Sequence, residues 1–84
     1  MKWQNHIKVN PKVAFGKPVV AGTRIPVYMV LELVEADYTP QQIVTDFYPT
    51  LTEDDIRACI RYATNLTKNE VITFARETAV AIAG

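Results

Sequence analysis

Five polar side chains between residues 57 and 68 have the types and the spacing of a nucleic-acid-binding surface. They are Arg57, Arg61, Thr64, Asn65 and Lys68. These positions correspond to i, i+4, i+7, i+8 and i+11, so on a helix they share one face. Arginine and lysine neutralise phosphates, while arginine and asparagine hydrogen-bond to guanine and adenine edges. The spacing therefore predicts a DNA-binding stripe along one helix.

A second candidate for anion binding is the stretch GKPVVAGTRIPV, residues 16–27, which contains Lys17 and Arg24. The stretch is not a P-loop, because its lysine directly follows the first glycine and Pro18 lacks an N–H that a phosphate cradle uses. Glycine tolerates positive φ, so we expect Gly22 to form the bend into the next helix, with an anion nest around Arg24 as the alternative. Lys17 and Arg24 are therefore further candidate phosphate contacts.

An acidic run, residues 53–55, precedes the stripe and argues against DNA binding. Recognition helices usually contact DNA through their N-terminal residues, where these carboxylates repel phosphates. Glu53 also lies four residues before Arg57, the spacing at which the two side chains pair on a helix. The alternative is a protein-interaction or dimerisation module that binds no DNA, in which the stripe is only a solvated face.

Neither catalysis nor metal binding is predicted. The single histidine, His6, stands near the N-terminus, and Cys59 falls on the apolar face of a predicted helix. No HExxH or CxxC spacing occurs in the sequence. The acidic run is explained by the preference of helix N-termini for carboxylates. We expect a non-enzyme without catalytic residues, metal or cofactor.

The composition describes one small domain with no excess of charge. The chain has 84 residues, a net charge of zero and a hydrophobic fraction of 49%. That fraction supports a core, but a domain this small is marginally stable alone, which favours a homodimer or a protein partner. The single cysteine predicts a cytoplasmic location, and no apolar run is long enough to span a membrane, so no membrane partner is expected.

The first 25 residues are expected to form a two-stranded ribbon. The two short extended runs are His6–Val9 and Pro18–Val20, with a loop between them. Pro26 suits the first turn of a helix, which we expect to end at residues 37–38. The apolar positions of this helix recur at helical spacing. They are Val27, Val30, Leu31 and Val34.

Two capping boxes then mark the starts of two more helices. Thr39 with Gln42 and Thr52 with Asp55 each place a hydroxyl at the N-cap and a side-chain acceptor three residues later. A short helix, a turn around Pro49 and a longer helix have helix-turn-helix spacing. With the preceding helix they predict a mainly α fold, a three-helix, homeodomain-like bundle over residues 1–66. The core positions expected on the second and third helices are Ile43, Val44, Phe47, Ile56, Cys59, Ile60 and Ala63.

Residues 67–84 are expected to form a separate C-terminal helical segment that docks on a partner. Thr67 and Glu70 have the spacing of a third capping box, and continuation of the third helix is the alternative. The segment has a narrow, alanine-rich apolar stripe, which suits docking against another chain. The expected docking residues are Val71, Phe74, Thr78 and Ile82.

Four segments of the sequence closely resemble family 433 of the domains of unknown function. They are Gly-Lys-Pro-Val at 16–19, Gly-Thr-Arg-Ile-Pro-Val at 22–27, Tyr-Pro-Thr-Leu-Thr at 48–52, and the helix from Asp-Ile to Tyr-Ala at 55–63. The resemblance covers about residues 5–65. The family commonly has glycine near position 37, where this chain has Asp37. Aspartate tolerates the left-handed conformation, so we expect the turn to be retained.

The resemblance implies a homeodomain-like antitoxin of the VapB kind, from a bacterial type II toxin–antitoxin pair. Proteins of this kind typically dimerise, bind their own operator DNA and cover the active site of a PIN-like ribonuclease toxin. The resemblance implies no catalytic residue. On that basis the basic stripe, Lys17 and Arg24 contact operator DNA, and residues 67–84 dock on the toxin.

Overall fold

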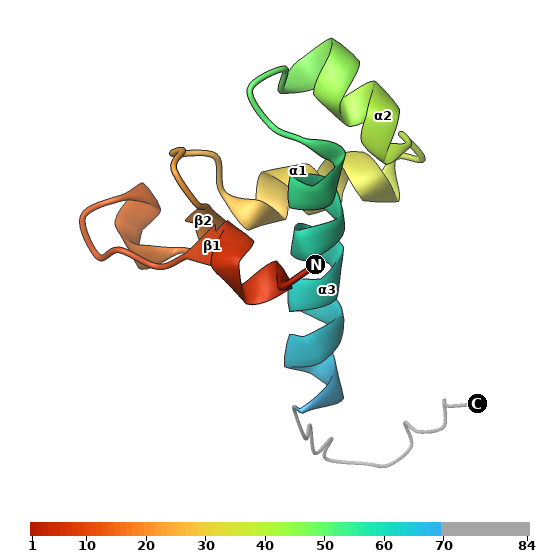
Figure 1. Ribbon diagram of the computed structural model, residues 1–84. Helices are drawn as coiled ribbons and strands as arrows, with labels where there is room; N and C mark the ends of the chain where they lie inside the picture. The colour runs from red at the N-terminus through yellow and green to blue at the C-terminus, as the bar shows by residue number, and fades with distance from the viewer. Residues whose placement is uncertain (70–84) are drawn as a thin grey trace.

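The computed structural model describes residues 1–69, which form three helices and a two-stranded sheet (Figure 1). In chain order the elements are the 3-10 helix η1 (Trp3–His6), strand β1 (Ile7–Lys8), the tight turn η2 (Ala14–Gly16), strand β2 (Val19–Val20), helix α1 (Val27–Glu35), helix α2 (Pro40–Gln42) with its π-helical continuation η3 (Ile43–Phe47), and helix α3 (Glu53–Lys68). The predicted mainly helical fold with two short N-terminal strands is thereby confirmed. In the described part of the chain, no helix has the length and apolar character needed to cross a membrane.

The two strands pair antiparallel, with Ile7 opposite Val20. A ribbon of this size is marginal by itself, so its stability depends on what it packs against. Val19 and Val20 are both buried, and Val20 belongs to the central hydrophobic cluster. The N–H of Val27 donates to the carbonyl of Pro18 at 2.9 Å, which ties the ribbon to the start of α1.

Gly22 forms the bend between the ribbon and α1, as the sequence predicts. Its φ is 78°, and a Cβ there would meet no atom within 4 Å, so the backbone conformation alone favours glycine. The Thr23 hydroxyl donates to the carbonyl of Val20 at 2.8 Å and accepts from the N–H of Ile25 at 3.0 Å. This hydroxyl therefore stabilises the turn itself.

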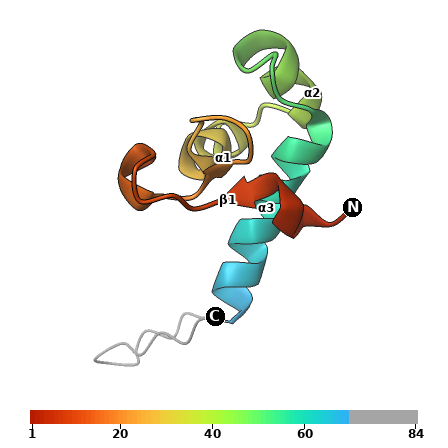
Figure 2. The same cartoon turned by 60° about the vertical axis from the view of Figure 1, so that its left-hand side comes forward.

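Helix α1 presents the predicted apolar face to the core. Val27 and Val30 are buried, while Leu31 and Val34 are half-buried against the central cluster. Pro26 is the N-cap residue, so the helix begins at Val27, one position after the predicted start. Figures 1 and 2 show that α1 lies across α3 instead of running along it, so the two helices meet over a short length.

The end of α1 passes through a left-handed residue, Asp37, with φ of 73°. The N–H of Tyr38 donates to the carbonyl of Leu33 at 3.2 Å, and the N–H of Asp37 donates to the carbonyl of Val34 at 3.0 Å. These two bonds form the Schellman motif in which glycine is usual. The expectation that aspartate retains this turn is confirmed.

Replacing Asp37 with valine should lower the free energy of unfolding by about 1 to 2 kcal/mol, because a β-branched residue is strongly disfavoured at positive φ. Asp37→Gly should leave stability unchanged or raise it by up to about 1 kcal/mol, since glycine adopts this conformation freely but has a more flexible unfolded chain. Urea unfolding followed by circular dichroism measures both. Equal stability of the valine and glycine variants would show that the left-handed turn is not present in solution.

Helix α2 begins at the predicted capping box. The N–H of Thr39 donates to Oε1 of Gln42 at 2.8 Å, and the N–H of Gln42 donates to Oγ1 of Thr39 at 3.1 Å. The helix then widens into the π-helical turn η3, where the N–H of Tyr48 donates to the carbonyl of Ile43 at 2.8 Å. This bond spans five residues, one more than in an α-helix.

The π-helical turn changes which side chain faces the core. Ile43 is fully buried as predicted, but the prediction that Phe47 faces inward is wrong, since Phe47 is 42% exposed. The extra residue in the turn places Tyr48 against the core in its stead. The ring of Phe47 packs edge-on against Tyr38, with centroids 4.9 Å apart.

Helix α3 begins at the second predicted capping box. The N–H of Thr52 donates to Oδ2 of Asp55 at 2.9 Å, and the N–H of Asp55 donates to Oγ1 of Thr52 at 3.1 Å. Ile56 and Cys59 are fully buried, as predicted. Ala58 is also fully buried, although the sequence analysis did not include it, because η1 packs along α3 and covers a second face of the helix.

The last turn of α3 differs from the prediction of a new helix start at Thr67. The helix runs on to Lys68, with Asn69 as its C-cap, and therefore passes the expected domain boundary after residue 66. The Thr67 hydroxyl donates backwards, to the carbonyls of Ala63 at 2.9 Å and Thr64 at 3.1 Å. Thr67 is thus an interior helical residue and not an N-cap. The rest of the expected C-terminal helix lies outside the described residues.

The hydrophobic core joins strand β2, helix α1, the π-helical turn η3, the turn before α3 and helix α3. Its buried members are Val20, Val27, Val30, Ile43, Leu51, Ile56 and Cys59. No polar or charged side chain among residues 1–69 is buried with them. The core packs against the side of α3 that carries Ile56 and Cys59, and the opposite side of α3 is exposed to solvent.

Candidate nucleic-acid interface

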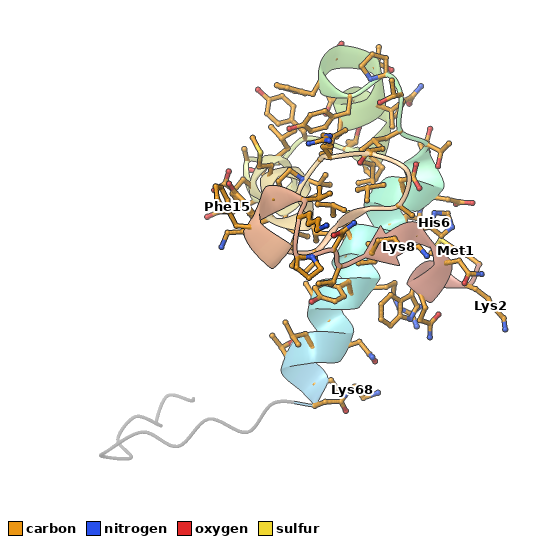
Figure 3. All side chains as sticks on the ribbon, turned by 90° about the vertical axis from the view of Figure 1, so that its left-hand side faces the viewer. Met1, Lys2, His6, Lys8, Phe15 and Lys68 are labelled. Atoms are coloured by element: carbon orange, nitrogen blue, oxygen red, sulfur yellow. The ribbon has the colours of Figure 1, made fainter. Side chains whose placement is uncertain are left out.

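The five polar residues predicted to form a DNA-binding stripe all lie on the exposed side of α3. Arg57, Arg61, Thr64, Asn65 and Lys68 are each classed as exposed, and the buried Ile56 and Cys59 lie on the other side of the helix. The C-terminal part of α3 extends away from the ribbon and the other helices (Figure 1), and Lys68 lies at its far end (Figure 3). The structure therefore brings the five stripe residues together on an accessible surface.

The positive charge of the stripe is concentrated in the second half of α3. A guanidinium nitrogen of Arg57 lies 3.6 Å from the Glu53 carboxylate and another lies 3.7 Å from that of Asp54. These exposed ion pairs are weak, but they reduce the net positive charge around Arg57. Within the described chain segment, neither Arg61 nor Lys68 has a carboxylate within 4.0 Å. Arg61 and Lys68 are thus the stripe's strongest candidates for phosphate contacts.

The third acidic residue of this run, Asp55, has a structural role. Besides its capping bonds with Thr52, its Oδ1 lies 2.7 Å from Nδ1 of His6, and both side chains are largely shielded from solvent. Burial alone raises the pKa of Asp55, but the hydrogen bonds from His6 and Thr52 outweigh burial and hold that pKa below its ordinary value. The sequence carries no signal for this pair, because His6 and Asp55 are 49 positions apart.

Lys17 and Arg24, the other two predicted DNA contacts, do not lie on the stripe. Lys17 lines an apolar groove together with Tyr62 and Leu66 of α3, and its ammonium lies 6.0 Å from the ring centroid of Tyr28. Arg24 lines a separate open cleft beside the Gly22 bend. The structure therefore distributes the predicted basic residues over three locations.

A basic residue that the sequence analysis missed, Lys8, lines the same cleft as Arg24. The pairing of β1 with β2 places Lys8 opposite Val19, and thereby near the turn that carries Arg24. Both side chains are exposed, and none of the described residues that line the cleft is acidic. This cleft is a second positively charged surface, and the alternation of polar and apolar residues in β1 is the signal that could have indicated it.

The reactive side chains of the described region are arranged for packing. Burial, together with the negative charge of Asp55, raises the pKa of the Cys59 thiol to about 12, so the thiol stays protonated. In residues 1–69, no group of three or more histidine, cysteine or acidic side chains is placed to hold a metal ion. The four predicted partner-docking residues, Val71, Phe74, Thr78 and Ile82, lie outside the described residues.

Comparisons with known proteins identify relatives of uncharacterised function. A family model described as "Protein of unknown function (DUF433)" matches residues 7–63. A crystal structure of a DUF433 member protein from Anabaena variabilis superposes with a TM-score of 0.68 at 26% sequence identity. The match covers 77% of this chain and 63% of that chain, so the present chain spans less than two thirds of that relative. No curated protein matches the sequence.

Proposed function

The chain belongs to the DUF433 family of proteins of unknown function, and from that premise we propose that it is the antitoxin of a bacterial type II toxin–antitoxin pair. In this proposal a homodimer binds operator DNA and neutralises a PIN-like ribonuclease toxin. The observation that supports DNA binding is the exposed stripe of Arg57, Arg61, Thr64, Asn65 and Lys68 on one side of α3. The family assignment names no activity, so the proposal depends on the chemistry of this surface.

The proposed mode of DNA contact uses the C-terminal half of α3. The short helical segment 40–47, the turn at residues 48–52 and α3 have the order of a helix-turn-helix, in which the second helix enters the major groove. Glu53 and Asp54 stand at the start of α3 and repel phosphates, so the contacting residues are those further along. Arg61 and Lys68 neutralise phosphates, and Asn65 between them is suited to an adenine edge.

The double variant Arg61→Ala/Lys68→Ala should weaken binding to operator DNA by about tenfold to a hundredfold and reduce the slope of log K against log salt by about two. Each phosphate that loses its contact with a basic side chain keeps its condensed counterion. The slope therefore falls by about one for each contact that is removed. Fluorescence anisotropy with duplex DNA from the chain's own promoter, titrated at several salt concentrations, measures both quantities. Because both side chains are exposed, the variant should fold like the wild type.

Lys12→Ala is the matched control, because this lysine is exposed and lies neither on the stripe nor among the residues that line the groove or the Arg24 cleft. It should leave operator affinity nearly unchanged. Undiminished DNA binding by the double variant would exclude α3 as the DNA-contacting element. A loss in Arg24→Ala alone would transfer the proposal to the cleft that Arg24 shares with Lys8.

Toxin neutralisation is assigned in this proposal to the C-terminal segment, through Val71, Phe74, Thr78 and Ile82. The protein itself has no catalytic role and no cofactor, and it acts in the cytoplasm, where both operator and toxin are found. The product of the neighbouring gene is the natural candidate for the toxin. Copurification of that product with this chain, together with loss of its ribonuclease activity in the complex, tests this part.

A protein-interaction module without DNA binding is the second candidate function. The specific observation in its favour is that Glu53 and Asp54 both lie within 3.7 Å of Arg57, so the N-terminal turn of α3 offers phosphates little net attraction. The zero net charge of the chain points the same way. Formation of the complex with the neighbouring gene's product, without any promoter binding at low salt, would establish this alternative.

A further inference from the structure

The loop between the two strands holds a phenylalanine in solvent on a backbone that side chains rarely adopt. Ala14, Phe15 and Gly16 have φ values of 51°, 56° and 82°. Three consecutive residues at positive φ are uncommon, and for a bulky residue such as Phe15 the conformation is an outlier. The turn is closed by hydrogen bonds from the N–H of Gly16 to the Val13 carbonyl and from the N–H of Lys17 to the Ala14 carbonyl, both 3.0 Å long. The backbone thus fixes the direction of the Phe15 side chain.

The Phe15 ring packs against almost no surface of the described residues. Its exposed fraction is 99%, compared with 42% for Phe47 and 38% for Tyr38. Figure 3 shows it at the outer edge of the N-terminal loop. Strained backbone conformations that persist without a local benefit concentrate at functional positions. An exposed aromatic ring is also a type of side chain that is enriched in the core of protein interfaces.

An apolar groove begins at the residues that directly follow this loop in the sequence. It has a volume of about 520 Å³, and its walls are formed by α1, by α3 and by the two residues that follow the turn. The residues that line it include Lys17, Pro18, Tyr28, Leu31, Tyr62 and Leu66. Tyr28 and Leu66 are about half exposed, so the groove presents aromatic and aliphatic surface to solvent. Among residues 1–69, no residue that lines the groove is acidic.

We propose that Phe15 of one chain inserts into this groove of a second copy, forming a two-fold symmetric dimer. The ring and the groove are only two residues apart in sequence, because Lys17 is part of the groove wall. One two-fold axis therefore brings both rings to both grooves at once, which is the closed arrangement that homodimers favour. The net charge of zero gives no repulsion between copies. Among the described residues that line the groove, Lys17 is the one that is charged. Its ammonium lies 6.0 Å from the centroid of the Tyr28 ring.

The dimer leaves the DNA-binding stripe accessible. Tyr62 and Leu66 lie four residues apart on one face of α3, while Arg61 and Asn65 lie on a different face. The inference names the contact that forms the homodimer of the proposed function, and rests on that function only for its biological purpose. It can be tested without DNA or toxin.

The first test is the mass of the full-length chain by sedimentation equilibrium as its concentration is raised. The wild type should approach twice the 9.5 kDa mass of one chain. Phe15→Asn should weaken the dimer by about tenfold or more, since asparagine tolerates positive φ and preserves the turn while removing the ring. Val9→Asn is the matched control, because Val9 is also an exposed apolar loop residue but lies outside the groove. It should leave the mass unchanged.

The second test is a disulfide between two different chains. One chain carries Phe15→Cys and the other carries Leu66→Cys, and the two are mixed and oxidised. A disulfide forms only if the two Cα atoms come within about 7 Å, so a mixed covalent dimer joined through positions 15 and 66 is expected. The native Cys59 is buried and does not compete.

Three results would overturn the inference. They are a wild-type chain that stays monomeric at all concentrations, a dimer that Phe15→Asn does not weaken, and the absence of the mixed disulfide. A dimer lost in Phe74→Asp but not in Phe15→Asn would assign the groove to the C-terminal segment and also overturn it. A dimer that binds operator DNA and that Phe15→Asn does not weaken refutes this inference alone, whereas a Phe15-dependent dimer that binds neither operator nor toxin refutes the proposed function alone.

Discussion

Replacing Ile43 with alanine is expected to lower the free energy of unfolding by about 2 to 5 kcal/mol, the range for truncating a fully buried aliphatic side chain. Ile43 has an exposed fraction of 0% and is the buried anchor of the helical segment 40–47 in the central cluster. In a domain of this size such a loss lowers Tm by about 10 °C or more. Thermal unfolding followed by circular dichroism at 222 nm measures the change.

Phe47→Ala is the informative comparison on the same segment. If the segment were a regular α-helix, Phe47 would follow Ile43 to the core, and its truncation would cost at least as much. With the π-helical turn in place, Phe47 loses mainly its edge contact with Tyr38, so about 1 kcal/mol is expected. Tyr48, which takes the inward position, should be the more sensitive aromatic residue. Comparable losses for Ile43→Ala and Phe47→Ala would contradict the π-helical turn.

Replacing Asp55 with alanine should destabilise the fold by about 2 to 4 kcal/mol. The carboxylate is one half of the capping box of α3, and removal of a cap costs about 1 kcal/mol. It also accepts the hydrogen bond of His6, and a bond to a charged group contributes about 1.5 to 3 kcal/mol. Asp54→Ala is the control, because Asp54 occupies the same helical turn but is exposed, and its loss should stay within about 0.5 kcal/mol. Urea unfolding of the two variants measures the difference.

The Asp55 interaction also makes stability depend on pH in a defined direction. The pKa of Asp55 in the folded chain lies below its reference value of 3.8, so the unfolded chain binds the proton more tightly. The stabilisation is complete above about pH 5, declines as the pH falls through the unfolded-state value, and is lost once the pH falls through the lower, folded-state value. Between pH 5 and pH 2.5, the wild type should therefore lose more stability than Asp55→Asn. Parallel curves of Tm against pH for the two proteins would show that this carboxylate is not held by His6 in solution.

The sequence predicted those parts of the fold that local chemistry determines. Both capping boxes, at Thr39 and Thr52, are formed with the predicted donors and acceptors. The apolar faces of α1 and α3 follow the helical period, and the Gly22 bend joins the ribbon to α1. Each of these features depends on residues within a few positions of one another, so a single sequence contains the necessary information.

The missed features depend on tertiary contacts or on rare backbone states. Ala58 is buried because η1 packs on α3 from more than 50 positions away, and periodicity within α3 cannot show this. A helical period of 3.6 residues predicts that Phe47 faces the core. The turn is π-helical instead, so this period does not hold there. The positive φ of Phe15 contradicts the usual preference of aromatic residues, so no propensity argument indicates it.

The candidate site was predicted in part, for the same reasons. The stripe on α3 needs only helical geometry, and all five residues are exposed on one side of that helix. The position of Lys17 over Tyr28 and the shared cleft of Arg24 and Lys8 depend on how the ribbon packs. Lys17 and Arg24 were predicted as further DNA contacts, and their location in the fold separates them from the stripe.

The burial of the Cys59 side chain makes this residue an internal gauge of the folding equilibrium. It is the chain's one thiol, and its exposed fraction is 0%. A thiol reagent can reach it only while the core is open, so the labelling rate under native conditions reports the population of opened molecules. Mass spectrometry of such labelling would rank all the stability variants above in plain buffer, without denaturant and without any engineered reporter.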